Sequence, residues 1–276
     1  ARHDLILFSD ADVRAPRDFL RSMVLPLREP GVALVNCFYR VANPNSRAME
    51  WEAVAINADF WSQVLQSQTL KPLDFALGAA VLLRRKALET VGGFRAFANC
   101  LADDYQIGHE IAKNGGQIAL CSVVVECWHP PMNWLEVWNH QLRWGRTIRV
   151  CQPGPYFLSI LSNSTLWPLI WLVDLIVWTK AVDALAPLAL MVARAAIAWR
   201  LQRRFNEGRQ RPAPLWLVPV KDLLQTAIWI AAFCGNKIEW RGRKMRLRRD
   251  GNLEPLARPA EALEERASAA APKPPA

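Results

Sequence analysis

The sequence predicts a layered α/β domain that is followed by helices able to enter a membrane. Three observations support this prediction. Short β-rich and helical segments alternate over residues 5–127, two long apolar runs follow residue 155, and 52% of the 276 residues are hydrophobic. This length accommodates one sizeable domain with an appendage, and this composition fits a globular protein that continues into a membrane.

The first part of the chain alternates between predicted strands and predicted helices. We expect strands over residues 5–9, 31–39, 75–83 and 117–127 and helices over residues 16–27, 46–68, 84–91 and 104–114. The short apolar run at 5–9 has the character of a buried parallel strand. This alternation indicates an α/β domain, but a doubly wound sheet also needs a first βαβ half, and only four residues precede residue 5. We therefore expect that half to be missing from this chain.

Two apolar runs beyond the domain are predicted to form a transmembrane helical hairpin at 156–199. The runs cover residues 156–178 and 181–199, and each is long enough, or nearly so, to cross a hydrocarbon core of roughly 30 Å. Internal residues such as Asp174 and Arg194 also fit a pair of helices buried in a soluble protein.

The region that follows, 200–249, is rich in Arg and is expected on the cytosolic side. Its two basic stretches are 200–211 and 237–249, and the positive-inside rule puts both of them in the cytosol. Because a single crossing between them would separate them, residues 214–235 are predicted to be an interfacial or re-entrant element, with a third crossing as the alternative. Residues 250–276 are rich in Ala, Pro and Glu and are predicted to be disordered.

The basic charge predicts an anionic partner. A formal charge of +9 and a pI near 9.6 fit nucleic acid, acidic lipid headgroups or a sugar-nucleotide diphosphate. The 13 Trp residues favour a membrane, because Trp concentrates at the headgroup level, and nucleic acid is not expected as a partner. The six cysteines show no zinc-like spacing and are expected to be reduced thiols on the cytosolic side.

Two pairs of acids are candidate site residues. Asp10 and Asp12 follow a predicted strand, and two carboxylates at this spacing can hold Mg²⁺ or Mn²⁺, although a solvated turn that caps a helix is the alternative. Asp103 and Asp104 open a predicted helix, where acids also act as caps. Like charges held together in a pocket, however, raise the pKa of a carboxyl toward that of a general base.

A basic helix is predicted at 134–149. His140, Arg143 and Trp144 fall on one side of it, and Arg146 and Arg149 extend the same face. Such a face suits a diphosphate, because an Arg fork reads phosphate oxygens and an indole can cover a leaving group. The alternative is an interfacial amphipathic helix on acidic lipids.

The order of four motifs resembles a known enzyme family. SDADVR, GAAVLLRRKALETVGGF, LADDYQIG and HQLRW, followed by a hydrophobic region, resemble family-2-type glycosyltransferases, and most closely the ceramide glucosyltransferase group. Relatives that modify hopanoids are similar as well. The resemblance spans roughly residues 4–150 and implies that residues 1–155 are the C-terminal part of a GT-A (nucleotide-diphospho-sugar transferase) domain.

The resemblance implies roles for the acids. Asp10 and Asp12 take the positions that bind Mg²⁺ or Mn²⁺ and the nucleotide sugar. Asp104 takes the position of the catalytic general base, and Asp103 that of its acidic neighbour. The implied activity is inverting transfer of a sugar, expected to be glucose, from a UDP-sugar to a lipid hydroxyl such as that of ceramide. The implied location is a multi-pass membrane protein with its catalytic domain on the cytosolic face.

The resemblance also implies that His140, Arg143 and Trp144 bind the nucleotide sugar, as the family's (Q/R)xxRW motif. His140 departs from the usual Gln or Arg, which leaves Arg143 and Trp144 as the firmer assignments. The family's N-terminal membrane helix and first nucleotide-binding strands have no counterpart in this sequence, so we expect the chain alone to be inactive.

Three other functions stay open at this point. One is transfer of N-acetylglucosamine or another sugar to a hopanoid or other lipid, which the residues above do not separate from transfer to ceramide. A processive polysaccharide synthase has little support, because few membrane segments follow HQLRW. An inactive, membrane-anchored binding or scaffold protein with a transferase-like fold is the alternative from another class.

Overall fold

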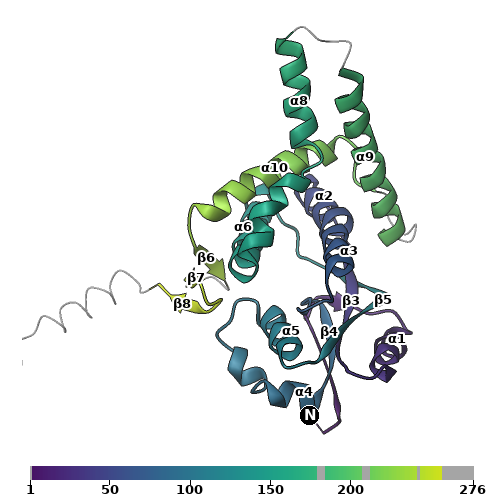
Figure 1. The fold of residues 1–276 in the computed structure, drawn as a ribbon, viewed down its shortest axis with the longest axis vertical. Coiled ribbons are helices and arrows are strands. Elements are labelled where there is room, and N and C mark those ends of the chain that lie inside the picture. The colour runs from purple at the N-terminus through teal and green to yellow at the C-terminus, as the bar shows by residue number, and fades with distance from the viewer. Residues whose placement is uncertain (1, 179–183, 207–211, 241–242, 257–276) are drawn as a thin grey trace, which may run out of the picture.

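A computed structural model describes most of the chain. The described residues are 2–178, 184–206, 212–240 and 243–256. Four predicted segments fall partly outside them: the second membrane run at residues 181–183, the two basic stretches at residues 207–211 and 241–242, and the tail at residues 257–276. The described part has a mixed α/β domain with a helical projection at one end (Figure 1).

A five-stranded sheet forms the centre of the domain. Its strands, in the order in which they pair, are β1 (Leu5–Ser9), β4 (Ala80–Arg84), β3 (Val32–Val41), β5 (Gln117–Cys127) and β2 (Val13–Arg14). The central pair β3 and β5 is parallel, and the other pairs are antiparallel. The sheet is therefore mixed, which is common where an antiparallel edge joins a parallel centre.

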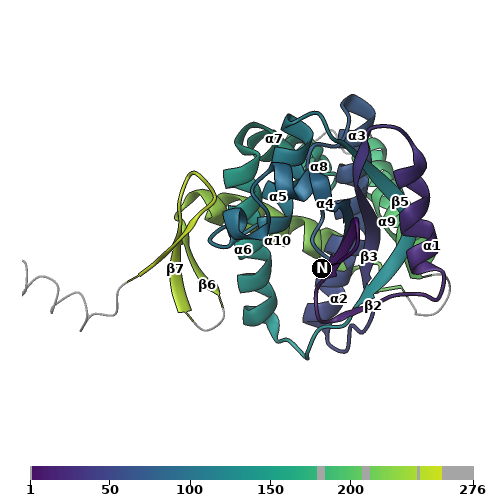
Figure 2. The ribbon, with the colours of Figure 1, turned by 90° about the horizontal axis from the view of Figure 1, so that it is seen from below.

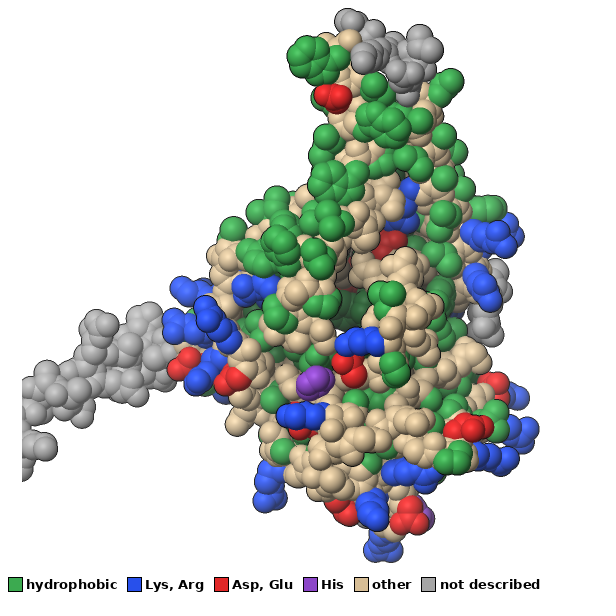
Figure 3. Space-filling model, viewed as in Figure 1, with side chains coloured by type: hydrophobic (Ala, Val, Ile, Leu, Met, Phe, Trp, Pro, Cys, Tyr) green, Lys and Arg blue, Asp and Glu red, His purple; other side chains and the backbone are tan. Residues whose placement is uncertain are grey.

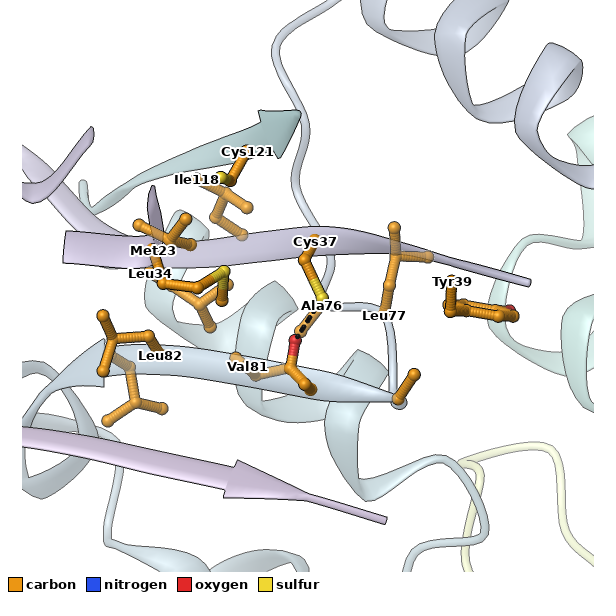
Figure 4. Close-up of a cluster of buried hydrophobic side chains, with 14 of the residues drawn as sticks. Met23, Leu34, Cys37, Tyr39, Ala76, Leu77, Val81, Leu82, Ile118 and Cys121 are labelled. Carbon is orange, nitrogen blue, oxygen red and sulfur yellow. Dashed lines mark hydrogen bonds between the residues drawn. The ribbon is translucent and has the colours of Figure 1, made fainter. Parts of the chain in front are cut away.

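Helices pack on this sheet and form its hydrophobic core. The helical segments of the domain are α1 (Phe19–Val24), η1 (Leu25–Arg28), α2 (Arg47–Val54), the π-helical turn η2 (Ala55–Phe60), α3 (Trp61–Leu70), α4 (Arg85–Thr90), η3 (Phe94–Phe97) and α5 (Asp103–Lys113). Figure 4 shows Met23, Leu34, Leu82 and Ile118 in the core, where Cys37 also donates its Sγ hydrogen to the carbonyl of Ala80 at 3.5 Å. This close packing fixes the strand ends that carry the polar residues discussed below.

The C-terminal helices form a separate layer. They are α6 (Trp134–Cys151), α7 (Pro153–Leu158), η4 (Ser159–Ser162), α8 (Leu166–Val177), α9 (Leu185–Asn206) and α10 (Leu217–Phe233). Asn133 and Glu136 form a capping box that starts α6. The helices α8 and α9 project from the domain, and α10 lies across their base (Figure 1). Hydrophobic side chains cover much of this projection (Figure 3).

Only α9, among the described residues, is by itself long and apolar enough to cross a membrane. The segment α7–η4 and the helix α8 would count as a second span only if taken together, and they are bent by 44°. The prediction of one continuous helix over 156–178 is therefore wrong. The break has a clear cause, because the Oδ1 of Asn163 accepts hydrogen bonds from the backbone N–H groups of Thr165 and Leu166 and starts α8 afresh.

A small three-stranded sheet ends the described chain. Its strands β6 (Lys237–Trp240), β7 (Arg243–Leu247) and β8 (Leu253–Pro255) form an antiparallel meander at one side of the domain (Figure 2). The prediction that residues 250–276 are disordered is thus wrong for 253–255, because β8 pairs with β7.

Two predicted strands also need correction. The strand at 5–9 is an antiparallel edge strand rather than a buried parallel one, because β1 pairs with β4, which runs in the opposite direction. The strand predicted over 75–83 begins only at Ala80. Before it, the Asn36 side chain donates to the Phe75 carbonyl and accepts from the Leu77 N–H, so these backbone groups bond a side chain in place of a neighbouring strand.

Candidate active site

The loop that follows β1 carries the first acidic pair. The N–H of Asp10 donates to the Ala79 carbonyl at 3.0 Å, and the N–H of Trp128 donates to the Asp12 carbonyl at 2.9 Å. These bonds hold the loop between the start of β4 and the end of β5. Both aspartates remain exposed, so their carboxylates can reach a ligand.

The second acidic pair begins α5 and meets the same stretch of chain. A Cβ atom added to Gly78 would lie 2.7 Å from Oδ2 of Asp104, so a side chain at this position would collide with the carboxylate. Gly78 precedes Ala79, which holds Asp10. Asp104 is half-buried, whereas Asp103 is exposed. This shared neighbour brings Asp104 close to the loop that carries Asp10.

The carboxylates influence one another. Although Asp10 is exposed, desolvation by the surrounding protein and then the charges of Asp12 and Asp103 raise its pKa to about 6. Burial raises the pKa of Asp104 to about 7, with the charges of Asp103 and Asp10 adding to the rise and a backbone N–H at Tyr105 opposing it. Asp104 thus has the pKa that a general base needs near neutral pH.

The helix α6 supplies the cationic side of the site. The half-buried guanidinium of Arg143 makes no hydrogen bond or ion pair with any described residue. Burial lowers the pKa of Arg143, and the charges of Glu52 and Asp10 oppose this effect. Trp144 packs against the ring of Phe60 at 6.3 Å between centroids. An unpaired guanidinium facing carboxylates favours an anionic ligand or a ligand-bound cation between them.

A family comparison identifies the kind of protein that carries this site. The family model described as glycosyl transferase family 21 matches residues 1–253. The chain belongs to glycosyltransferase family 21. Its site therefore serves a sugar donor and an acceptor. The mixed α/β sheet is consistent with the GT-A domain that the sequence resemblance implies.

Sequence analysis missed one buried acid in this glycosyltransferase. Glu52 of α2 is 0% exposed, and its Oε1 lies 2.5 Å from Nδ1 of His140 and 3.1 Å from Nε2 of Gln141. Burial would raise the pKa of Glu52, but the contacts with His129, His140 and Gln141 lower it to about 2. The only signal in the sequence was an acid beside Trp51, on the apolar face of a helix.

His129 lies between the buried Glu52 and Asp12 of the first acidic pair. Its Nδ1 lies 3.6 Å from Glu52, and its Nε2 lies 3.6 Å from Oδ2 of Asp12. The contact with Glu52 raises the pKa of His129, while burial opposes the rise. His140 therefore contacts Glu52 in this structure, and the diphosphate role implied by its motif position receives no support from this geometry.

The other basic residues of α6 have structural partners. Arg146 donates to the carbonyl of Lys237, and Arg149 donates to the carbonyl of Gly235 at 3.5 Å. These two arginines thus contact the start of the C-terminal meander, and their place on a diphosphate-binding face stays a prediction. Arg143 is the arginine of this helix that stays available for a phosphate.

The donor set around Asp10 suits a hard divalent cation only in part. Among the described residues no group of three or more His, Cys, Asp or Glu side chains could hold a metal ion. Asp10 and Asp12 offer carboxylate oxygens, which Mg²⁺ and Mn²⁺ prefer, and a cation there would complete its shell with water or phosphate oxygens. The raised pKa of Asp10, to which the charge of Asp12 contributes, fits the arrival of a cation at this pair.

Proposed function

We propose that this family 21 enzyme transfers a sugar, with inversion, from a UDP-sugar to a lipid hydroxyl at the cytosolic membrane surface. Glucose and ceramide are the proposed sugar and acceptor. The observation that supports this most directly is the position of Asp104, a half-buried carboxyl with a pKa raised to about 7, in the same site as Asp10 and the unpaired Arg143. A base and an anion-binding group side by side are what glycosyl transfer requires.

At the donor end, Asp10 and Asp12 would hold Mg²⁺ or Mn²⁺. The cation would neutralise charge on the diphosphate that leaves. Arg143 would bind the same diphosphate through its guanidinium fork, since it has no partner among the described residues. Trp144, next to Arg143 on α6, would form a wall of the pocket.

At the acceptor end, Asp104 would accept the proton of the lipid hydroxyl. The hydroxyl oxygen then forms a bond to the anomeric carbon while the bond from that carbon to the diphosphate oxygen breaks, so the configuration inverts. The proton stays on Asp104, and the electron pair leaves with the UDP. Asp103, exposed beside Asp104, would keep the pKa of Asp104 high through its charge.

The lipid acceptor is proposed from the surface of the C-terminal helices. Large apolar side chains on α7 and α8 are exposed, including Phe157 at 57%, Trp167 at 43% and Trp171 at 42%. Exposed aromatic residues of this kind anchor proteins at the headgroup level. An enzyme anchored through α7, α8 and α9 could take a headgroup without removing the lipid from the bilayer.

Replacing the proposed base provides the test. Asp104→Asn in the full-length protein, purified in detergent with Mn²⁺, is expected to lower transfer from UDP-glucose to ceramide by about 10²- to 10⁴-fold. Binding of UDP-glucose should be unchanged, because the donor is held by other residues. The matched control is Glu110→Gln, a change to a partly exposed acid on the same helix, which should retain transfer.

Each alternative predicts another result. Wild-type transfer by Asp104→Asn would exclude Asp104 as the base. Transfer from UDP-N-acetylglucosamine to a hopanoid, without transfer to ceramide, would move the substrate assignment and keep the mechanism. UDP-sugar binding without any transfer would favour the alternative that the protein is an inactive, membrane-anchored binding or scaffold protein.

A further inference from the structure

The C-terminal meander is bonded directly to the loop that leads into α5. The N–H of Leu253 donates to the Asn99 carbonyl at 2.8 Å, and the N–H of Leu101 donates to the Gly251 carbonyl at 3.1 Å. Between these bonds, Cys100 and Asn252 face each other in an antiparallel bridge. A segment 152 residues later in the chain thus extends the backbone pairing of the acidic loop.

The turn before β8 also fits closely against the start of α5. Gly251 has a φ of +83°, and a Cβ atom added there would lie 2.9 Å from Nε2 of Gln106. Gln106 lies two residues after Asp104 on the same helix. The turn therefore depends on glycine both for its backbone conformation and for its contact with α5.

The opposite end of the meander is attached to α6. Arg146 and Arg149 donate to the carbonyls of Lys237 and Gly235, where the meander begins. The meander therefore connects the helix of Arg143 to the loop of Asp104. These are the two sides of the proposed active site, which face the diphosphate and the acceptor.

Residues 99–101, which lead into α5, form few backbone hydrogen bonds with neighbouring residues of their own segment. Ala102 precedes α5 and provides no side-chain cap, so the first turn of α5 is held instead by the Asp103 carboxylate, which accepts from the Asp104 N–H, and by the Tyr105 hydroxyl, which donates to the Cys151 carbonyl. Within its own segment, the Cys100 N–H donates to the Phe97 carbonyl and the Gln106 N–H donates to the Ala102 carbonyl. Leu101 and Asn99, on either side of the bridge, are bonded to the meander instead.

We infer that the meander β6–β8 is a positioning element for the catalytic base, and that it acts by staying docked on residues 99–101. This inference rests on the proposed role of Asp104. A small displacement of a base relative to its substrate lowers the rate of the chemical step far more than it lowers donor binding. Leu253 and Gly251 are thus positioning residues, although they lie outside the motifs.

Removing one backbone donor tests the inference. Leu253→Pro deletes the N–H that bonds to Asn99, and we expect kcat to fall by roughly tenfold or more with KM for the UDP-sugar unchanged. Leu256→Pro is the matched control, because it deletes a similar bond, from Leu256 to the carbonyl of Lys244, on the side of the meander away from the loop. The control should keep the wild-type kcat.

A reversible crosslink provides the rescue. In an antiparallel bridge of this type the two Cα atoms are about 4.5 Å apart, within the range of a disulfide. Asn252→Cys can therefore form a disulfide with Cys100 when diamide takes up the two thiol hydrogens. In the double variant with Leu253→Pro, oxidation should restore kcat, and dithiothreitol should lower it again. Wild-type protein with diamide controls for the other thiols.

The outcomes are distinct. A wild-type kcat in Leu253→Pro, or a disulfide that forms without raising kcat in the double variant, would overturn the inference. If Leu253→Pro does not fold, the single variant Asn252→Cys provides the test. Its oxidised form should keep the wild-type kcat. A loss of kcat on oxidation that dithiothreitol reverses would show that the meander must move, and would overturn the inference. Wild-type transfer by Asp104→Asn would instead overturn the proposed function on which the inference rests.

Discussion

Two clusters of charged side chains in this protein are built in opposite ways. One joins the helices at the base of the projection and consists of Asp59, Arg194, Lys221 and Asp222. The other is the candidate active site around Asp10. The first cluster has two acidic and two basic side chains that pair with one another. The second has four acidic side chains, and its arginine, Arg143, forms no ion pair with any described residue. Comparing them separates charge that holds the fold together from charge that is available to a ligand.

The junction cluster is closed. Arg194 of α9 lies 2.8 Å from both Asp59 of η2 and Asp222 of α10, and Lys221 contacts the same two aspartates. Thr165 donates a further hydrogen bond to Asp222. Buried charges are tolerated when each is paired and hydrogen-bonded in this way. The cluster therefore links the domain to α9 and α10 and leaves no charge for a ligand.

The active-site cluster is open. Asp10, Asp12, Asp103 and Asp104 act on one another, and Arg143 has no ion-pair partner among the described residues. The raised pKa values of Asp10 and Asp104 show that this arrangement disfavours their ionised forms. Such a site can take up a cation between its carboxylates and an anion at Arg143, and groups left available in this way are typical of an active site.

The largest expected effect distinguishes the two clusters by stability. Asp222→Ala would leave Arg194 and Lys221 short of a buried partner and should lower the free energy of unfolding by about 3–5 kcal/mol. Asp10→Ala should leave stability unchanged or raise it, because the folded protein disfavours the Asp10 charge. Thermal unfolding in detergent measures both. Equal losses in the two variants would contradict the distinction between closed and open clusters.

The next largest effect distinguishes the active-site cluster from the junction cluster by transfer activity. Arg143→Met should lower kcat/KM for the UDP-sugar by roughly 10²- to 10³-fold, since it removes the charge that we propose binds the departing diphosphate. Its stability should stay close to that of the wild type, because Arg143 has no ion pair to lose within the described residues. Arg47→Met, which removes an exposed ion pair with Glu50, is the control and should change neither property. A large loss of stability in Arg143→Met would mean that Arg143 is structural.

The sequence predicted the elements of the active site better than those of the junction. Asp10 and Asp104 could be named as candidates because local signals mark strand ends and helix starts, and the resemblance to a known family then implied their roles. The junction pairs join Arg194 to Asp59 across 135 positions, and Lys221 to Asp59 across 162. No local pattern reports contacts over such separations, so the sequence gives no sign of these ion pairs.

Strand direction and helix breaks were also beyond the sequence. The apolar run at 5–9 looks the same whether its neighbour is parallel or antiparallel, and pairing with β4 decides the direction. The side chain of Asn163 breaks the first predicted membrane run through two local hydrogen bonds. The buried Glu52 became interpretable only when the fold brought His129 and His140 to it.

The smallest expected effect is a pH dependence in which stability and transfer activity change in opposite directions. The pKa of Asp104 rises from an ordinary value of 3.8 to about 7 in the folded protein. Between these two values the folded protein keeps a proton that the unfolded chain has released. The free energy of unfolding should therefore fall as the pH rises from about 4 to 7, by an amount on the order of 2 kcal/mol after solvent screening is allowed for.

Transfer should change in the opposite direction over the same range. A base must be ionised to accept the hydroxyl proton, so kcat should rise as the pH passes through about 7. Thermal unfolding at pH 5 and pH 8 in metal-free detergent, compared with kcat at the same values, tests both trends. Asp104→Asn should flatten the stability trend, whereas Glu110→Gln should preserve it. If the wild type were more stable at pH 8 than at pH 5, Asp104 would be ionised throughout, and the acidic site would then be paired as fully as the junction.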